Sequence, residues 1–209
     1  MPINWLFQQP AFFVAWVVAV VITLSWHEFS HALTALWFGD STAKDNGRLT
    51  LNPLVHIDIL GFFMLLVAGF GWAKPVPVNP YNLKKPRLAM GVISFAGPLS
   101  NVLAMVIFGL IFKAVSPVLG PDNLLVNFLF MLALINLSLF IFNLIPIPPL
   151  DGSKVLFSLL PDKFDNFKYK FSINGPFILF GLILLDSVFN LGIFSALFNF
   201  VMSFLYKFF

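Results

Sequence analysis

The stretch Trp26-His27-Glu28-Phe29-Ser30-His31 lies inside an apolar run that extends from Ala11 to Phe38. About 28 helical residues, at a rise of about 1.5 Å each, are long enough to cross a hydrocarbon layer of roughly 30 Å. The run therefore predicts a membrane-spanning helix, which ends at Gly39-Asp40-Ser41. Ionisable groups at membrane depth are costly and usually functional, so this stretch is the first candidate for a site.

Two imidazoles and one carboxylate of this stretch form the pattern His-Glu-x-x-His. His27 and His31 are four residues apart, so on a helix they share one face and can reach one tetrahedral metal ion. Glu28 projects from a neighbouring position, where it can act on a water without binding the ion. The pattern predicts one zinc ion per chain and Glu28 as the general base of a hydrolysis. The alternative is a helix whose histidines pair with polar neighbours near the lipid headgroups and bind nothing.

The composition places the whole chain in a membrane. Of its 209 residues 59% are apolar and only 10% are charged, whereas about a quarter of the residues in soluble domains are charged. We therefore expect an all-α polytopic membrane protein in a lipid bilayer, with about four to six transmembrane helices in a single domain over residues 1–209. The net charge of +3 lies in short loops and gives no nucleic-acid footprint.

Two further apolar runs, residues 88–115 and 124–144, are each long enough for a full span. Residues 57–70 are short for a span, so we expect a re-entrant or packed segment there, with a complete span as the alternative. Residues 176–209 fit one tilted span or a tight pair of helices broken near Asn190-Leu191-Gly192. The first ten residues lack the features of a cleaved signal peptide, so the first span is expected to stay in the protein.

The polar segment between Ser41 and Pro53 predicts a small β-hairpin. It contains Asn46-Gly47, a strong two-residue hairpin turn, and an alternating stretch follows it at Arg48-Leu49-Thr50-Leu51. We therefore expect a small membrane-associated β-hairpin or sheet after the first span. The basic residues Lys44 and Arg48 of this segment favour the cytoplasmic side, which predicts a multi-pass protein of the cell membrane with its site towards the cytoplasm.

A catalytic zinc needs a third protein ligand beside the two histidines. The chain has no cysteine, which excludes thiolate ligands and leaves histidine and carboxylate. The candidates are His56, Asp58, Asp151 and Asp186. Asp151 is the best of them because it follows a proline-broken helix at the same depth and side as the two histidines. Its alternative role is the N-cap of a short helix over residues 153–160.

Two motifs of the chain together resemble the site-2 protease family of intramembrane zinc metalloproteases. They are His27-Glu28-Phe29-Ser30-His31 and Asn143-Leu144-Ile145-Pro146-Ile147-Pro148-Pro149-Leu150-Asp151-Gly152. Between them Gly97-Pro98-Leu99-Ser100-Asn101 and the loop from Gly71 to Pro80 resemble family segments as well. The resemblance covers most of residues 20–155. The chain resembles the small members, which lack an inserted PDZ-type domain and an appended nucleotide-sensing domain.

The resemblance implies a role for each matching residue. His27, His31 and Asp151 would be the zinc ligands, and Glu28 would be the base that activates water. Asn143 matches an asparagine that helps to hold the substrate or its developing oxyanion. The loop over residues 71–80 would be an edge with which a substrate strand pairs, and the substrate would be a transmembrane protein cut within or near its membrane segment. The sequence leaves the oligomeric state open.

Two other functions compete with a metalloprotease. A membrane zinc carrier or channel could use the same histidines and aspartate, although a carrier ordinarily spreads its ligands over membrane depth. A catalytically silent scaffold is the third possibility. Two polar residues also keep alternative interpretations: His56 contacts a metal or substrate or only stabilises a turn through Asp58, and Asn101 reaches the site or forms only an interhelical hydrogen bond.

Overall fold

The computed structural model describes residues 3–68 and 71–208 of the chain. Four of its helices are long and apolar enough to cross a membrane. They are α2 (Pro10–Trp37), α5 (Pro86–Leu119), α6 (Leu124–Asn143) and α8 (Asp165–Phe189). The other helices are α1 (Ile3–Gln8), α3 (Thr42–Asp45), α4 (Ile59–Ala68), α7 (Asp151–Leu159) and α9 (Ile193–Phe208), and three 3-10 turns are η1 (Pro53–Val55), η2 (Pro80–Asn82) and η3 (Asp162–Phe164).

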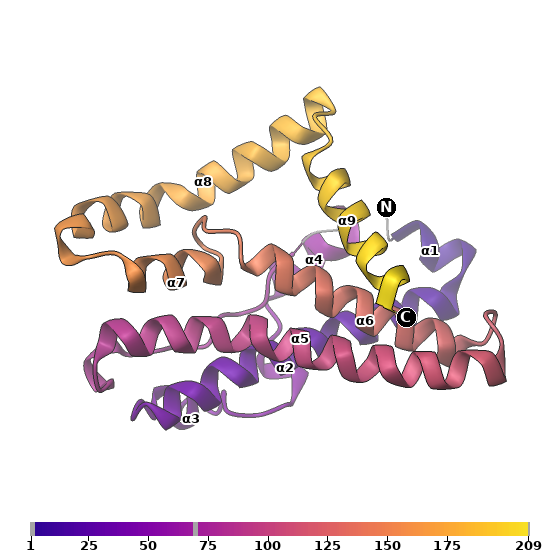
Figure 1. Ribbon diagram of the computed structural model, residues 1–209, viewed down its shortest axis with the longest axis horizontal. Helices are drawn as coiled ribbons and strands as arrows, with labels where there is room; N and C mark the ends of the chain where they lie inside the picture. The colour runs from indigo at the N-terminus through magenta and orange to yellow at the C-terminus, as the bar shows by residue number, and fades with distance from the viewer. Residues whose placement is uncertain (1–2, 69–70, 209) are drawn as a thin grey trace.

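Helices α2, α5 and α6 form the centre of the molecule, and α7 lies along α5 (Figure 1). The contacts between the three helices use small or flexible side chains, such as Ala19 of α2 against Met131 and Leu132 of α6. Small residues let helix backbones approach closely, which is how helices associate where lipid is as apolar as the side chains. This close packing brings polar groups of three separate helices to one place.

Helix α8 stands apart from this centre, while α9 returns to it (Figure 1). Val201 and Leu205 of α9 are buried against Met105 of α5 and Leu137 of α6. In α8, by contrast, Gly175 is the buried residue among those the structure describes. A Cβ on Gly175 would overlap the ring of Pro148, so this glycine lets α8 touch the proline-rich loop.

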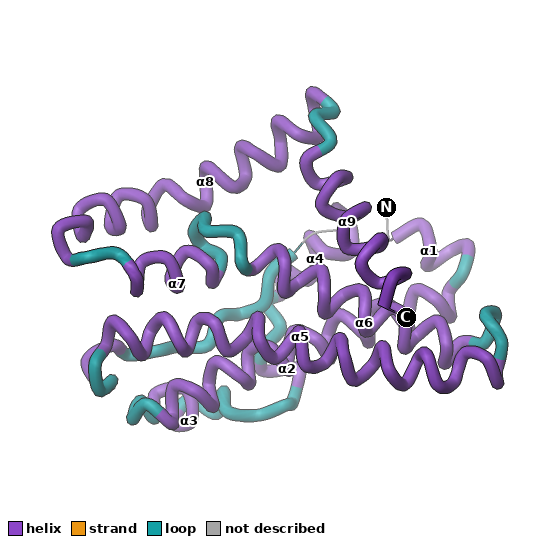
Figure 2. Tube along the Cα trace, viewed as in Figure 1, coloured by secondary structure: helices purple, strands orange, loops and turns teal. Residues whose placement is uncertain are grey.

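The predicted β-hairpin or sheet is wrong. Residues 3–68 and 71–208 contain no strand, as the colouring of Figure 2 shows, and only an isolated antiparallel bridge joins Ile57 to Ala73. Asn46-Gly47 ends helix α3 instead of turning a hairpin. The N–H of Gly47 bonds to the Lys44 carbonyl and that of Arg48 to the Ala43 carbonyl, with Gly47 at φ +67°. This is a Schellman motif, which makes the same demand for glycine as a hairpin turn does.

The two open alternatives have clear outcomes in the structure. Helix α4 has 10 residues, about 15 Å of helix, which is too short to cross the hydrocarbon layer. Residues 69–70 lie outside the described part of the chain, and residues 71–79 are not helical. At the C-terminal end, α8 and α9 are two helices separated at Asn190 (φ 51°) and Gly192 (φ 76°), so the helix pair is present and the single span is not.

Candidate metal centre

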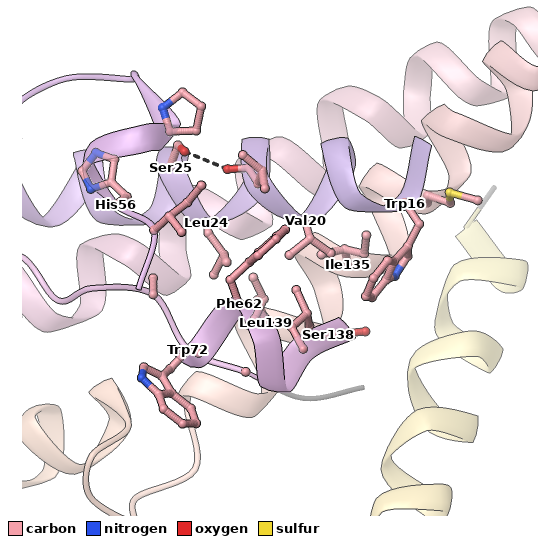
Figure 3. A pocket seen from close by; sticks show the side chains of 18 of the residues that line it. Trp16, Val20, Leu24, Ser25, His56, Phe62, Trp72, Ile135, Ser138 and Leu139 are labelled. Atoms are coloured by element: carbon pink, nitrogen blue, oxygen red, sulfur yellow. Dashed lines mark hydrogen bonds between the residues drawn. The ribbon is translucent and has the colours of Figure 1, made fainter. Parts of the chain in front are cut away.

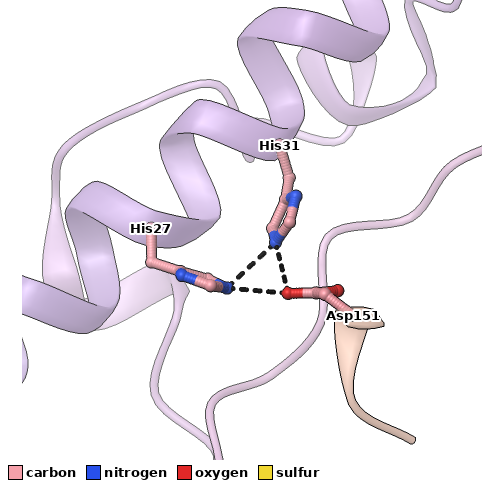
Figure 4. A group of neighbouring side chains, drawn as sticks. All are labelled: His27, His31 and Asp151. Carbon is pink, nitrogen blue, oxygen red and sulfur yellow. Dashed lines mark hydrogen bonds and ion pairs between the residues drawn. The ribbon is translucent and has the colours of Figure 1, made fainter. Parts of the chain in front are cut away.

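Three predicted residues meet in the interior, as Figure 4 shows. His27 Nε2 and His31 Nε2 are 3.0 Å apart, and each is 3.1 Å from the same oxygen, Asp151 Oδ2. All three residues are buried. They come from α2 and from the first residue of α7, and among the described residues they form the one group of histidines and carboxylates placed to share a metal ion.

The hydrogen bonds on the far side of the two rings decide which ring nitrogen carries the hydrogen. His31 Nδ1 lies 2.7 Å from the carbonyl oxygen of Ile93, which can only accept, so Nδ1 donates. His27 Nδ1 lies 2.6 Å from Asn101 Oδ1, and this amide uses its nitrogen to donate to α6. Both Nε2 atoms therefore point lone pairs at the carboxylate of Asp151. Three acceptors within about 3 Å repel one another unless a cation lies among them.

These three atoms fit zinc. Zinc bonds to nitrogen and oxygen at about 2.0–2.2 Å in a tetrahedron, which separates its ligand atoms by roughly 3.3 Å. Two imidazole nitrogens and one carboxylate oxygen form a three-ligand set that leaves the fourth position open, as catalytic zinc sites do. The donor set and the fixed tautomers thus match what a catalytic zinc ion requires.

Local sequence explains why the rings can converge. His27 and His31 lie one turn apart on α2, so their side chains reach the same side of the helix. Gly97 of α5 faces them, and a Cβ at this position would overlap both imidazole rings. The N-cap position of α7 belongs to Leu150, and Asp151 is the first helical residue. The alternative role of Asp151 as an N-cap is therefore not what the structure contains.

A chain of side-chain amides fixes His27 from behind. Asn101 Oδ1 accepts from His27, and Asn101 Nδ2 donates to Asn136 Oδ1 at 2.9 Å. Asn136 Nδ2 in turn donates to Thr23 Oγ1 at 3.1 Å and to the Leu132 carbonyl at 2.8 Å. Thus Asn101 both reaches the site and makes an interhelical hydrogen bond, which joins the two interpretations left open by the sequence.

Glu28 is held beside the cluster by the loop that follows α4. Its Oε2 accepts the N–H of Val76 at 3.0 Å, and Glu28 is 9% exposed. The loop is held in turn by Arg48, whose buried guanidinium donates to the carbonyls of Lys74 and Pro75. One carboxylate oxygen of Glu28 is therefore held by a loop that is separate from α2 and that contributes no metal ligand.

Asp40 fastens the end of α2 to the segment before α5. It is fully buried and accepts hydrogen bonds from Thr42, from the Asn79 N–H at 2.7 Å and from Asn82 Nδ2 at 2.9 Å. Burial raises the pKa of this carboxyl, but the hydrogen bonds from Thr42, Asn82 and Asn79 outweigh it and hold the pKa below its usual range. Asp40 thus stabilises the scaffold of the site in its ionised form.

The other candidate residues lie elsewhere. His56 Nε2 donates to the Thr50 carbonyl at 2.8 Å, and Asp58 caps α4 by accepting the Gly61 N–H. Asp186 accepts the first N–H groups of α9, from Ile193 and Phe194. Asn143 is half-buried at the end of α6, where its Nδ2 donates to the Leu139 carbonyl at 3.1 Å. None of these bonds joins His56, Asp58, Asp186 or Asn143 to the metal cluster in the described structure.

Four groups that serve the site were not assigned to it from the sequence. The Ile93 carbonyl and the Val76 N–H are backbone groups, which leave no mark in a sequence. Asn136 and Thr23 did leave one, because polar residues inside spans predict interior contacts. Their partner could not be named without the packing of α2, α5 and α6.

Comparisons with known proteins find one family and several relatives that are named as zinc metalloproteases. The pattern of "Peptidase family M50" matches residues 120–184. The chain is 44% identical over 151 residues to "Putative zinc metalloprotease YwhC" of Bacillus subtilis, a match that covers 69% of this chain and 68% of that protein. It is 36% identical over 163 residues to MJ0611 of Methanocaldococcus jannaschii, named in the same way, with 75% and 78% covered. The Rip2 protein of Mycobacterium tuberculosis is 35% identical, and the match spans 56% of its length. No solved structure matches the chain.

Proposed function

We propose, from the premise that this chain belongs to peptidase family M50, that it is an intramembrane endopeptidase that cuts other membrane proteins within or near their transmembrane segments. Membership makes the protein a zinc metalloprotease, and its apolar helices make it a multi-pass membrane protein. One observation carries the proposal. His27 Nε2, His31 Nε2 and Asp151 Oδ2 turn three lone pairs towards one buried point, with helices of membrane-spanning length around it.

In the proposed reaction His27, His31 and Asp151 hold the zinc ion. When bound, zinc lowers the pKa of a water towards about 7 and polarises a peptide carbonyl. Glu28 takes a proton from the attacking water and later gives it to the leaving nitrogen, first as a general base and then as a general acid. The Val76 N–H fixes one oxygen of Glu28, which leaves the other oxygen to carry that proton.

The substrate segment has to unwind before it can be cut, because a helix hides its peptide bonds in internal hydrogen bonds. We assign Asn143 to this step. Its Nδ2 carries two hydrogens and uses one on the Leu139 carbonyl, so the second can bond to a carbonyl of the unwound substrate. Asn143 is the last residue of α6, and the proline-rich turn that follows it leads to Asp151, the first residue of α7.

Replacing Glu28 tests the proposed function. The Glu28→Gln variant keeps the shape of the side chain and loses the base, so hydrolysis of a purified single-span substrate should fall by about 10²–10⁴-fold. Its zinc content should stay that of the wild type. A zinc carrier would behave differently, because transport needs no base and would survive the change. Undiminished cutting by Glu28→Gln would remove the proposed mechanism.

We also propose that the protein lies in the cell membrane with its site towards the cytoplasm, because the loops near the cluster carry Lys44, Arg48, Lys74 and Lys84. The absence of cysteine makes a direct test simple. A Lys44→Cys variant should resist a membrane-impermeant maleimide in intact cells, whereas Asp122→Cys, in the loop between α5 and α6, should react. The reverse labelling pattern would invert the orientation.

A further inference from the structure

A separate pocket of about 440 Å³ lies among α2, α4, α6 and the segment around Trp72. Its walls are almost entirely apolar, and Figure 3 shows Val20 and Leu24 of α2, Phe62 of α4 and Leu139 of α6 around one space, with His56 and Trp16 at opposite ends of the view. Pockets of this size and lining, with few polar groups, are typical of sites that bind part of a ligand.

Among the described residues that line the pocket, His56 is the one with a buried polar atom that has no hydrogen-bond partner. Ser25 and Ser138 donate to carbonyls of their own helices, and Asp58 accepts the N–H of Gly61. His56 is 2% exposed, and its Nε2 donates to the Thr50 carbonyl, so its Nδ1 bears a lone pair. This Nδ1 is buried and has no hydrogen-bond partner within the described residues. A buried acceptor of this kind calls for a donor that the described residues do not supply, such as a water molecule or an N–H of a ligand.

Two segments that line the pocket also position the proposed catalytic base Glu28: helix α2 and the loop that contains Val76. Leu24 and Ser25 line it and precede Glu28 by four and three residues, which is one turn along the same face of α2. Ala73 also lines it, three residues before Val76, whose N–H binds Glu28. The lining of the pocket therefore comes within one helical turn of Glu28 on α2 and within three residues of its partner on the loop.

The chemistry of the pocket favours a peptide over a lipid. An unwound transmembrane segment presents apolar side chains together with backbone N–H groups that have lost their partners and need acceptors at membrane depth. The acyl chain of a lipid fills apolar space equally well but has no hydrogen to donate to His56 Nδ1.

We infer that this pocket is a specificity subsite, which takes a large apolar side chain of the substrate next to the cut bond while His56 Nδ1 accepts a backbone N–H of the same segment. The inference rests on the proposed function. It adds the substrate feature that the enzyme recognises, which is a large apolar side chain at one position next to the cut bond. His56 is a substrate-binding residue in this arrangement and takes no part in metal binding.

Filling the pocket tests the first half of the inference. Val21 lines the pocket, whereas Val18 on the same helix is 42% exposed and lies outside it, so Val21→Phe and Val18→Phe are a matched pair. Both are assayed on synthetic single-span peptides in which each position flanking the cut carries Ala, Leu or Phe. The wild type and Val18→Phe should prefer Leu or Phe over Ala at one position, and Val21→Phe should reverse this preference by about tenfold. Zinc content should be the same in all three proteins.

Changing the substrate backbone tests the second half on the unaltered enzyme. Replacing single amides by esters removes one N–H at a time, outside the bond that is cut. One ester position should lower kcat/KM by about three- to tenfold, and that loss should disappear in the His56→Phe variant. If His56→Phe does not fold, the ester scan of the wild type still stands, since a flat profile at every position overturns the role of His56.

The outcomes separate this inference from the function on which it rests. If the wild type cuts the peptides but Val21→Phe keeps the wild-type preference, the subsite is wrong and the protease remains. If Val21→Phe displaces a co-purifying lipid without changing the preference, the pocket is a lipid site and the inference is overturned. If the wild type, loaded with zinc, cuts no peptide, the proposed function fails and the subsite fails with it.

Discussion

Helices α2 and α8 are both apolar and long enough to cross a membrane, yet the structure uses them differently. Helix α2 buries Thr23, His27, Glu28 and His31, and each of these side chains has a hydrogen-bonding partner on another segment. Helix α8 buries Gly175 alone among its described residues. Two helices of similar apolar character therefore differ in role: α2 positions the residues of the metal centre, whereas the side chains of α8 are mainly exposed. Buried polar groups with partners on other helices, rather than hydropathy, distinguish the two.

The largest expected effect compares the aspartate that joins the two histidines of α2, Asp151 of α7, with an aspartate of α8, Asp186. Asp151→Ala removes a proposed zinc ligand and should reduce hydrolysis of a single-span substrate to the background rate. Asp186→Ala, at the end of α8, removes only the cap of α9 and should keep activity within about threefold of the wild type. Equal losses in the two variants, measured by initial rates, would contradict the contrast between the metal cluster built on α2 and helix α8.

The next effect concerns the amide that orients His27. Asn101→Leu removes the acceptor of His27 Nδ1 and should weaken zinc binding by about 10–100-fold in a chelator competition. The control is Asn127→Leu, because the Asn127 amide donates to the carbonyls of Pro121 and Asn123, in the loop before α6. A positioning role for Asn101 predicts that Asn101→Gln restores part of the affinity. Wild-type zinc affinity in Asn101→Leu would contradict it.

A larger side chain should destabilise the protein when it is placed in α2 but not when it is placed in α8. Ala19 is fully buried against α6, so Ala19→Leu should lower the free energy of unfolding in detergent by about 1–3 kcal/mol through overpacking. A Cβ on Gly181 of α8 meets nothing within 4 Å, so Gly181→Leu should lose no stability and can gain helix propensity. Thermal unfolding of the two variants measures the difference. A destabilised Gly181→Leu would mean that α8 is packed.

The smallest effect is confined to acid. The pKa of Asp40 is lowered in the folded protein, so its contribution is complete above the pKa of about 3.9 of an unfolded aspartate. That contribution is lost as the pH falls from the unfolded pKa towards the folded pKa, because the unfolded chain binds the proton at a higher pH than the folded protein does, which favours unfolding. The stability difference between wild type and Asp40→Asn should therefore be constant from about pH 5 to 7 and shrink below about pH 4. A difference that grows in acid would reverse the assigned sign.

Much of the helical fold and of the metal cluster could be predicted, because both follow from local rules. Apolar runs of spanning length mark α2, α5 and α6, and the four-residue spacing of His27 and His31 places both rings on one side of α2. Asp151 could be chosen as the third ligand because the proline-broken helix before it places this residue at the same membrane depth, and on the same side of the membrane, as the two histidines. The structure brings these three residues together, while their function as ligands stays a prediction.

The rest depends on packing that local rules do not contain. Asn46-Gly47 satisfies a Schellman motif and a hairpin turn equally well, and the helical residues of α3 decide between them. The Ile93 carbonyl and the Val76 N–H are invisible in a sequence. Asn101 could be placed only when α5 and α6 were in contact with α2, and the pocket beside His56 arises from four segments far apart in the chain.

Zinc content measured on the purified protein tests the metal centre most directly. Elemental analysis should find one zinc ion per chain in the wild type and in Asp186→Ala, and X-ray absorption should show two imidazoles and an oxygen ligand around it. The His27→Ala and Asp151→Ala variants should each lose most of that zinc after dialysis against a weak chelator. Retention of a full equivalent of zinc by a doubly substituted His27→Ala, Asp151→Ala protein would contradict the assignment of the site.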